Sequence, residues 1–246
     1  MSALAVLLIA VGIADAWRRL SRSILLPVIA GPVAVVACAA LCGLWHAGDM
    51  VLLGFVAVVT VAWEVLCRRS ERTGRNHSRP LAVMSIAVAT LIALSGWTSH
   101  VGGLAARWAH WVALPLGHVA PTRILMVIGV VLLQLATGNQ LVRLVLGTVG
   151  VVRPAGQPQA SDRLKGGRLL GPMERMLILS LGMGGQVGAA GAVVAAKGLI
   201  RFPELNAQKG RNGDVGIDTV TEYFLVGSFA SWLLALAGLA LILATR

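Results

Sequence analysis

Apolar residues in this chain come in long runs that are separated by short polar stretches. A helix needs about 20 apolar residues to cross a hydrocarbon core that is about 30 Å thick, and these runs are of that order. The pattern therefore predicts an all-α fold, a polytopic transmembrane helical bundle of about six or seven membrane-spanning helices. The candidate spans are Ala3–Trp17, Ile24–Trp45, Met50–Leu66, Leu81–Trp97, Ile124 to about Val149, Met176–Ala196 and Tyr223–Ala244.

Two of these spans have unusual lengths. As a helix, Ala3–Trp17 rises only about 21 Å, so we expect it to tilt, to thin the bilayer or to lie at the surface without fully spanning. The run from Ile124 to Val149 is overlong and is interrupted at Gly138-Asn139-Gln140. Its second half has the pattern of an interfacial helix.

Basic residues alternate between the loops and predict an orientation. Three loops are rich in arginine and lysine, around 18–22, 68–79 and 153–168, whereas the loops 46–49 and 98–121 contain almost none. By the positive-inside rule the rich loops are cytoplasmic, which places the C-terminus inside. The 201–218 loop carries Arg201, Lys209 and Arg211 yet falls outside in this topology, and a re-entrant Met176–Ala196 segment would move it to the cytoplasm.

The composition and charge agree with a membrane protein. The chain is 57% hydrophobic and 13% charged, against roughly 25% charged residues in a soluble domain. The net charge of +11 lies in short loops at helix ends, which indicates orientation signals and anionic lipid head groups and not nucleic acid. We therefore expect membrane lipids, including anionic head groups, as partners.

The pattern also predicts three regions. Residues 1–152 form an N-terminal transmembrane helical region, and 153–166, rich in proline and glycine, form a cytoplasmic linker. Residues 167–246 form a C-terminal transmembrane helix pair that is framed by charged residues.

That charged frame is the main candidate polar site. Glu174 and Lys197 are 23 positions apart, about 35 Å along one helix, so we expect them at opposite membrane faces. Thr219 and Glu222 have the spacing of a capping box at the start of the last helix. One interpretation is that the charged frame fixes the depth of the helices in the membrane, and the other is that it binds a head group or a substrate. The candidate residues are Lys197, Arg201, Glu222 and Tyr223 at one face, and Arg168, Glu174 and Arg175 at the other.

Small and polar residues inside the spans suggest how the helices pack. Gly184 with Gly188, and Gly227 with Ser231, form two small-xxx-small faces, along which we expect the last two spans to pack or the protein to self-associate. Two intramembrane amides, Gln134 and Gln186, are expected to bond a neighbouring helix or to line a polar cavity.

The remaining polar residues offer weaker candidates. Asp15 and Glu64 each precede an arginine by three or four residues, which is typical of interfacial ion pairs. Very few acids are expected to be buried, which argues weakly against a proton-coupled pump. Histidines of the outer loops, with Asp49, could bind a metal, but their spacing is not that of helical ligand pairs, and we expect neither metal nor cofactor. No common catalytic motif occurs.

The C-terminal part resembles a family of uncharacterised bacterial membrane proteins, a domain of unknown function. The resemblance covers about a quarter of the chain, with the pattern G-x-x-x-G-x-x-E-R, then K, R-F and E-Y-x-x-x-G-S-x-x-S. The matching positions are Gly167, Gly171, Glu174, Arg175, Lys197, Arg201, Phe202, Glu222, Tyr223, Gly227, Ser228 and Ser231. The resemblance implies a multi-pass protein of a bacterial cytoplasmic (inner) membrane and names no reaction.

These observations favour a non-enzymatic integral membrane protein that acts as a transport component or as an accessory subunit of an envelope complex. Protein partners or a homo-oligomer are compatible with either role. One alternative is a membrane-embedded enzyme that acts on a lipid-linked substrate through Glu222, Lys197 and Arg201. Another is a purely structural membrane partner.

Overall fold

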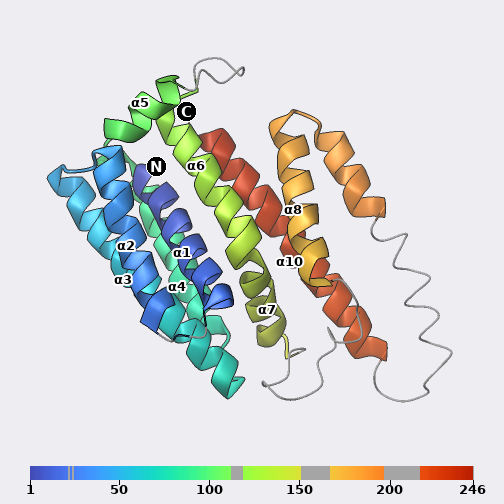
Figure 1. Cartoon of the computed structure of the whole chain (residues 1–246). Coiled ribbons are helices and arrows are strands. Elements are labelled where there is room, and N and C mark those ends of the chain that lie inside the picture. Colours follow the sequence, from blue (N-terminus) through green and yellow to red (C-terminus); the bar gives the residue numbers. More distant parts are fainter. Residues whose placement is uncertain (22, 24, 112–118, 151–166, 197–216, 246) are drawn as a thin grey trace. The chain divides into compact units, whose positions relative to one another are not determined.

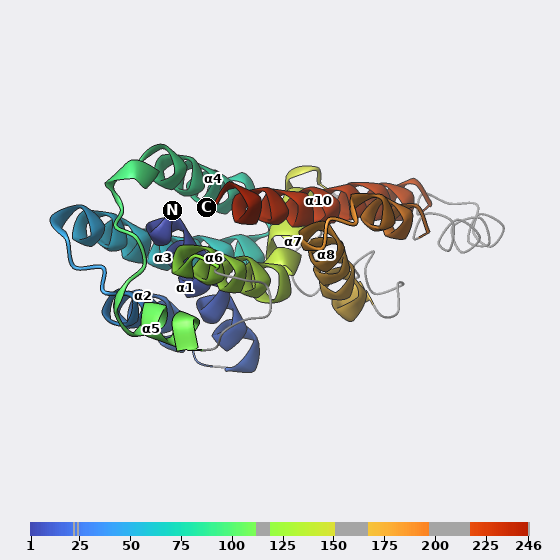
Figure 2. The ribbon, with the colours of Figure 1, turned by 90° about the horizontal axis from the view of Figure 1, so that it is seen from above.

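Helix α1 (Ser2–Leu20) packs against α2 (Leu25–Cys42) and α6 (Pro121–Leu132) in a computed structural model of the chain. The structure describes residues 1–21, 23, 25–111, 119–150, 167–196 and 217–245. Residues 2–12 of α1 are buried without a break. This follows from a sequence that is apolar on all sides of the helix, because such a helix must be enclosed by other helices or by lipid. Figures 1 and 2 show α1 with α2 and α6 beside it.

The other elements of the described chain are also helical. They are α3 (Ala47–Thr73), α4 (Ser78–Ala93), the 3₁₀ turn η1 (Ser95–Trp97), α5 (Gly103–Trp111), the π-helical turn η2 (Leu133–Thr137), α7 (Gly138–Thr148), α8 (Gly167–Met183) and α10 (Ile217–Ala244). No strand occurs in the described residues, so the predicted helical class is confirmed.

Four helices of the described chain are long and apolar enough to cross a membrane. They are Leu25–Cys42, Ala47–Thr73, Pro121–Thr148 and Phe224–Ala244, and each overlaps a predicted span. Of the other predicted spans, Ala3–Trp17 lies in α1, and Leu81–Trp97 is represented by the 16-residue helix α4 and the turn η1. The count of about six or seven spans stays a prediction.

The prediction that Met176–Ala196 forms one continuous helix is wrong. Helix α8 ends at Met183, and a separate short helix covers Val187–Ala196. Gly185 has a φ of +75°, in the left-handed region that glycine favours. The amide of Gln186 bonds the Leu181 carbonyl and that of Gly185 bonds the Gly182 carbonyl, which is the Schellman pattern that ends a helix.

The short helix packs back against α8. Ile178 of α8 and Ala190 of the short helix share one buried cluster with Ala235 of α10, and Figure 1 shows the two helices side by side. The chain therefore reverses at Gly184 and Gly185. Glu174 and Ala196 are consequently not the two ends of a single helix, so the predicted distance of about 35 Å, which assumed one continuous helix, does not apply.

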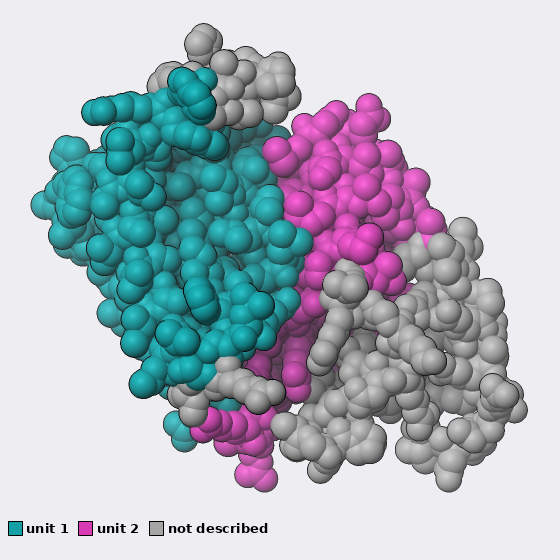
Figure 3. Space-filling model, viewed as in Figure 1, with its two compact units in different colours: residues 1–69, 79–137, 240–246 teal, residues 70–78, 138–239 magenta. Residues whose placement is uncertain are grey.

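The structure divides into two compact units, which Figure 3 colours separately. One unit contains Met1–Arg69, Arg79–Thr137 and Ala240–Arg246, and the other contains Ser70–Ser78 and Gly138–Leu239. Helix α7 groups with the second unit, and the predicted division into regions 1–152, 153–166 and 167–246 stays a prediction. The predicted linker 153–166 lies outside the described residues.

Glycines allow α1 and α6 to approach closely in the first unit. A Cβ added to Gly129 would lie 2.9 Å from the Ala5 carbonyl oxygen, and one added to Gly12 would lie 2.8 Å from the Leu132 Cβ. Both contacts are too short for an ordinary side chain, and a backbone carbonyl cannot move aside alone. The α1–α6 interface therefore requires glycine at these positions.

We expect Gly129→Ala to lower the free energy of unfolding by about 1–3 kcal/mol, because the added methyl group must push the two helices apart. Thermal unfolding in detergent, followed by circular dichroism, measures this loss. Gly54→Ala is the matched control, since a Cβ there meets nothing within 4 Å. Equal unfolding temperatures for the two variants would contradict the close α1–α6 contact.

Candidate functional site

Four charged side chains of the first unit form a cluster inside the helices. Asp15 and Arg18 come from α1, and Glu64 and Arg68 come from α3. Each acid precedes its arginine by one helical turn, so both members of a pair lie on the same face of their helix. We call these four residues the charge cluster.

The acids of the charge cluster are fully buried. Asp15 and Glu64 are both 0% exposed, whereas the side chains of Arg18 and Arg68 are 15% and 16% exposed. The predicted ion pairs are confirmed, since Arg18 lies 2.7 Å from Asp15 and Arg68 lies 3.8 Å from Glu64. The expectation that these acids would not be buried is wrong. The acids are buried because α1 and α3 pack against each other, which encloses both carboxyl groups between apolar helices.

Arg18 connects the two pairs. Its Nη2 atom lies 2.7 Å from Asp15 Oδ1, and its Nη1 atom lies 4.0 Å from Glu64 Oε2. The Asp15 and Glu64 carboxyl groups are near enough to act on each other. The cluster thus holds two carboxyl groups and two guanidinium groups, whose formal charges cancel when all are ionised.

Asp15 has a well-defined environment. The indole Nε1 of Trp63, a residue that is 0% exposed, donates to both Asp15 oxygens at 3.4 and 3.3 Å. The Thr137 side chain also lies near Asp15. Together with the short contact to Arg18, these groups fix the orientation of the Asp15 carboxyl group.

Glu64 is held less firmly. Its two contacts with arginine nitrogens, at 4.0 and 3.8 Å, are both longer than a hydrogen bond. Both of its carboxyl oxygens are buried, and neither accepts a hydrogen bond from a described residue. A buried ionised carboxylate without such a donor is costly. A proton on Glu64 would remove that charge and would give it a donor toward Asp15.

A π-helical turn lies beside the charge cluster in the first unit. The turn η2 contains Gln134 and Thr137, both 0% exposed. A wider helical turn disturbs the regular backbone bonding, and the Arg19 guanidinium donates to the carbonyl oxygens of Leu135 and Ala136 in this turn. Such turns occur frequently at functional sites.

The predicted charged frame is only partly described. Lys197 and Arg201 lie outside the described residues, and so do the side chains of Arg168 and Tyr223. Glu222 is exposed on α10. Because α10 begins at Ile217, Thr219 already lies within the helix and is not its N-cap, so the predicted capping box is wrong.

Two residues of the frame are buried in the second unit. Glu174 is 9% exposed and Arg175 is 1% exposed. The Arg175 guanidinium donates to Ser231 Oγ of α10 at 3.1 Å and to Asn139 Oδ1 of α7 at 2.8 Å. Arg175 therefore joins three helices of this unit, which favours a packing role for it over head-group binding.

The predicted small-residue faces differ from the observed contacts. Gly184 lies in the turn after α8, and a Cβ on Gly188 would meet nothing within 4 Å. The close α8–α10 contact is instead at Gly182, where an added Cβ would clash with Leu239 Cδ2. Gly227 faces Val142 and Leu146 of α7.

The two amides that were predicted to lie within the membrane, Gln134 and Gln186, have different environments. Gln134 is buried in η2, and its bonding to a neighbouring helix or lining of a polar cavity stays a prediction. Gln186 is exposed at the turn between α8 and the short helix, because the chain reverses there. Gln186 is therefore not an intramembrane packing residue of a continuous span.

Polar residues at the start of α3 and after η1 form a small hydrogen-bonded group. His46 Nδ1 lies 3.5 Å from Asp49 Oδ2, and Asp49 Oδ1 accepts a bond from the Ser99 amide at 2.9 Å. Ser99 also bonds His46 through its hydroxyl group. These contacts tie the start of α3 to the segment after η1.

Comparison of the chain with protein-family models, curated proteins and solved structures returns no match. The resemblance of the C-terminal part to an uncharacterised bacterial membrane family stays a prediction.

The positions of the two acid–arginine pairs along their apolar runs were a sequence signal for the charge cluster. Each acid–arginine pair lies at the C-terminal end of its own apolar run. The two pairs can therefore meet if the two helices pack in parallel, but not if they pack antiparallel. Trp63 precedes Glu64 directly and gave no separate signal. Only the packing of α1 against α3 brings its indole to Asp15.

Proposed function

We propose that this protein is a multi-spanning transport component of a bacterial cytoplasmic membrane and that its charge cluster carries a transferable proton. The proposal includes about six or seven spans and a cytoplasmic C-terminus, for which the arginine-rich loops are the support. Ionisable side chains buried inside membrane helices are costly and typically mark ion or proton pathways.

One observation carries this proposal. Glu64 is fully buried beside the Asp15 carboxyl group, and no nitrogen or hydroxyl of the described residues donates a hydrogen bond to either of its oxygens. Two buried carboxyl groups in contact favour a state in which they share one proton. Arg18 and Arg68 stabilise the two carboxylates that remain after the proton leaves. Both the protonated and the fully ionised charge cluster are therefore accessible.

The test is proton movement across a membrane. The purified protein is reconstituted in liposomes that contain a pH-sensitive dye, and an inward driving potential is applied. We expect faster internal acidification than in protein-free liposomes, and we expect Asp15→Asn and Glu64→Gln to reduce it to the protein-free level. Glu222→Gln is the matched control, because it makes the same acid-to-amide change at an exposed position.

A second measurement separates proton binding from proton movement. Infrared spectroscopy across a pH titration should show a protonated carboxyl band that disappears in Glu64→Gln. A band without flux would contradict the transport role but keep the proton site. The absence of both would overturn the proposal.

A further inference from the structure

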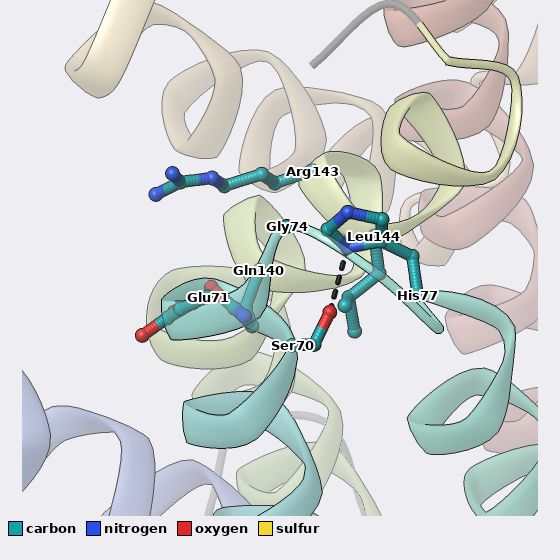
Figure 4. Close-up of a pocket in the computed structure, with 7 residues that line it drawn as sticks. All are labelled: Ser70, Glu71, Gly74, His77, Gln140, Arg143 and Leu144. Carbon is teal, nitrogen blue, oxygen red and sulfur yellow. Dashed lines mark hydrogen bonds between the residues drawn. The ribbon is translucent and has the colours of Figure 1, made fainter. Parts of the chain in front are cut away.

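A small pocket in the second unit has donors that lack an acceptor. The pocket lies between the end of α3 and α7 (Figure 4). It is lined by Ser70, Glu71, Gly74 and His77 on the α3 side and by Gln140, Arg143 and Leu144 of α7. Its volume is about 10 Å³, enough for one oxygen-sized group. The unpaired donors of the pocket indicate which chemical group binds in it.

Gln140 supplies the first donor. Its side chain is 8% exposed, and its amide nitrogen Nε2 is buried with no hydrogen-bond partner in the described part of the chain. An amide nitrogen can only donate. A buried donor without an acceptor is destabilising, so this position favours a ligand that brings an acceptor oxygen.

His77 supplies the second donor. Its Nδ1 lies 2.7 Å from Ser70 Oγ, the bond drawn in Figure 4. We assign the serine hydroxyl as the donor of this bond, which places the imidazole hydrogen on Nε2. That Nε2 atom is also buried and lacks a partner among the described residues. In that tautomer, two N–H groups of the pocket lack an acceptor.

The surroundings add positive charge. Arg143, an exposed residue of α7, is part of the pocket wall. The segment 70–78 also carries exposed Arg72 and Arg75. Glu71 is the opposing charge in the wall, and it is already engaged in an interaction of its own. The balance favours an anion over a cation.

The position of the pocket along the helices indicates where that anion comes from. It lies near Thr73 and Thr148, the last residues of two candidate membrane spans. Ser70 is 23 positions after the start of α3, about 35 Å along the helix, which is beyond a hydrocarbon core of about 30 Å. The pocket therefore has the depth of lipid head groups.

We propose that this pocket binds the phosphate group of an anionic phospholipid, with one phosphate oxygen accepting from Gln140 Nε2 and His77 Nε2 and with Arg143 pairing its charge. Guanidinium groups bind phosphate strongly because their donors are arranged as a fork. This inference is independent of the proton site, since it uses none of its residues.

The test compares ligands on the whole protein in a neutral detergent. The shift of the thermal unfolding temperature is measured with phosphatidylglycerol, with phosphatidylcholine and with inorganic phosphate, because a ligand of the folded state raises that temperature. We expect phosphatidylglycerol to stabilise more than phosphatidylcholine. Stabilisation by inorganic phosphate to the same extent would assign the site to free phosphate and would overturn the lipid assignment.

Variants identify the pocket as the binding site. We expect Arg143→Gln and Gln140→Leu each to weaken the apparent affinity for phosphatidylglycerol about tenfold. Arg107→Gln is the control for Arg143, because Arg107 is an exposed arginine of α5. Gly147→Ala is a further probe, since a Cβ there would lie 2.5 Å from His77 Cγ.

Two results would overturn the proposal. If Arg143→Gln, which changes an exposed residue and should fold normally, binds phosphatidylglycerol as well as Arg107→Gln does, the pocket is not the lipid site. If no lipid shifts the unfolding temperature of the wild type selectively, the two donors are completed by water alone.

Discussion

Arg18→Met is expected to lower the free energy of unfolding by about 3–5 kcal/mol, because it leaves two buried carboxyl groups without the cation that joins them. Arg18 makes the 2.7 Å contact with Asp15 and the longer contact with Glu64. Breaking one member of a buried ion pair costs far more than removing the pair as a whole.

Denaturant unfolding of the detergent-solubilised protein measures this loss, and Arg107→Met is the control at an exposed position. Adding Asp15→Asn to Arg18→Met should recover part of the stability, because the amide carries no charge that needs the guanidinium group. A double variant as unstable as the sum of the two single variants would show that Asp15 and Arg18 do not interact.

Arg175→Leu should cost about 3 kcal/mol of folding free energy, since it removes the donors of two bonds that join α7, α8 and α10 in the second unit. We expect Arg175→Lys to be intermediate, because lysine keeps the charge but cannot reach Ser231 and Asn139 at once. Thermal unfolding and protection from proteolysis report the effect.

A related substitution tests the same arrangement from the backbone side. A Cβ added at Gly138 would lie 2.7 Å from Arg175 Nη2, so Gly138→Ala should displace the guanidinium group and resemble Arg175→Lys. If Arg175→Leu unfolds at the wild-type temperature, Arg175 has no packing role, and head-group binding becomes the better explanation for its charge.

Some of the candidate site was predictable from local sequence. The pairing of Asp15 with Arg18 and of Glu64 with Arg68 follows from spacing along a helix, where residues three or four apart are neighbours. The meeting of the two pairs was not predictable in this way. It depends on the side on which α1 and α3 contact each other, and apolar residues on every side of α1 leave that side unspecified.

The end of α8 at Met183 could not be predicted from hydropathy. The run 176–196 is apolar enough for a membrane span. Hydropathy depends on side-chain polarity and carries no information about a glycine that adopts a positive φ. The Gly184-Gly185 pair ends α8 because Gly185 adopts a positive φ and closes the Schellman bonds. Once the chain reverses, the spacings predicted along one continuous helix no longer hold.

The helical class, the apolar runs and the local ion pairs follow from the amino-acid pattern, because each of these depends on residues that are near in the chain. The tertiary structure alone decided that Asp15 and Glu64 are buried together, that Trp63 bonds Asp15, and that His77 and Gln140 share a pocket. These contacts join residues far apart in the chain. Their energies depend on the side on which each apolar helix packs, which the hydrophobic pattern leaves open.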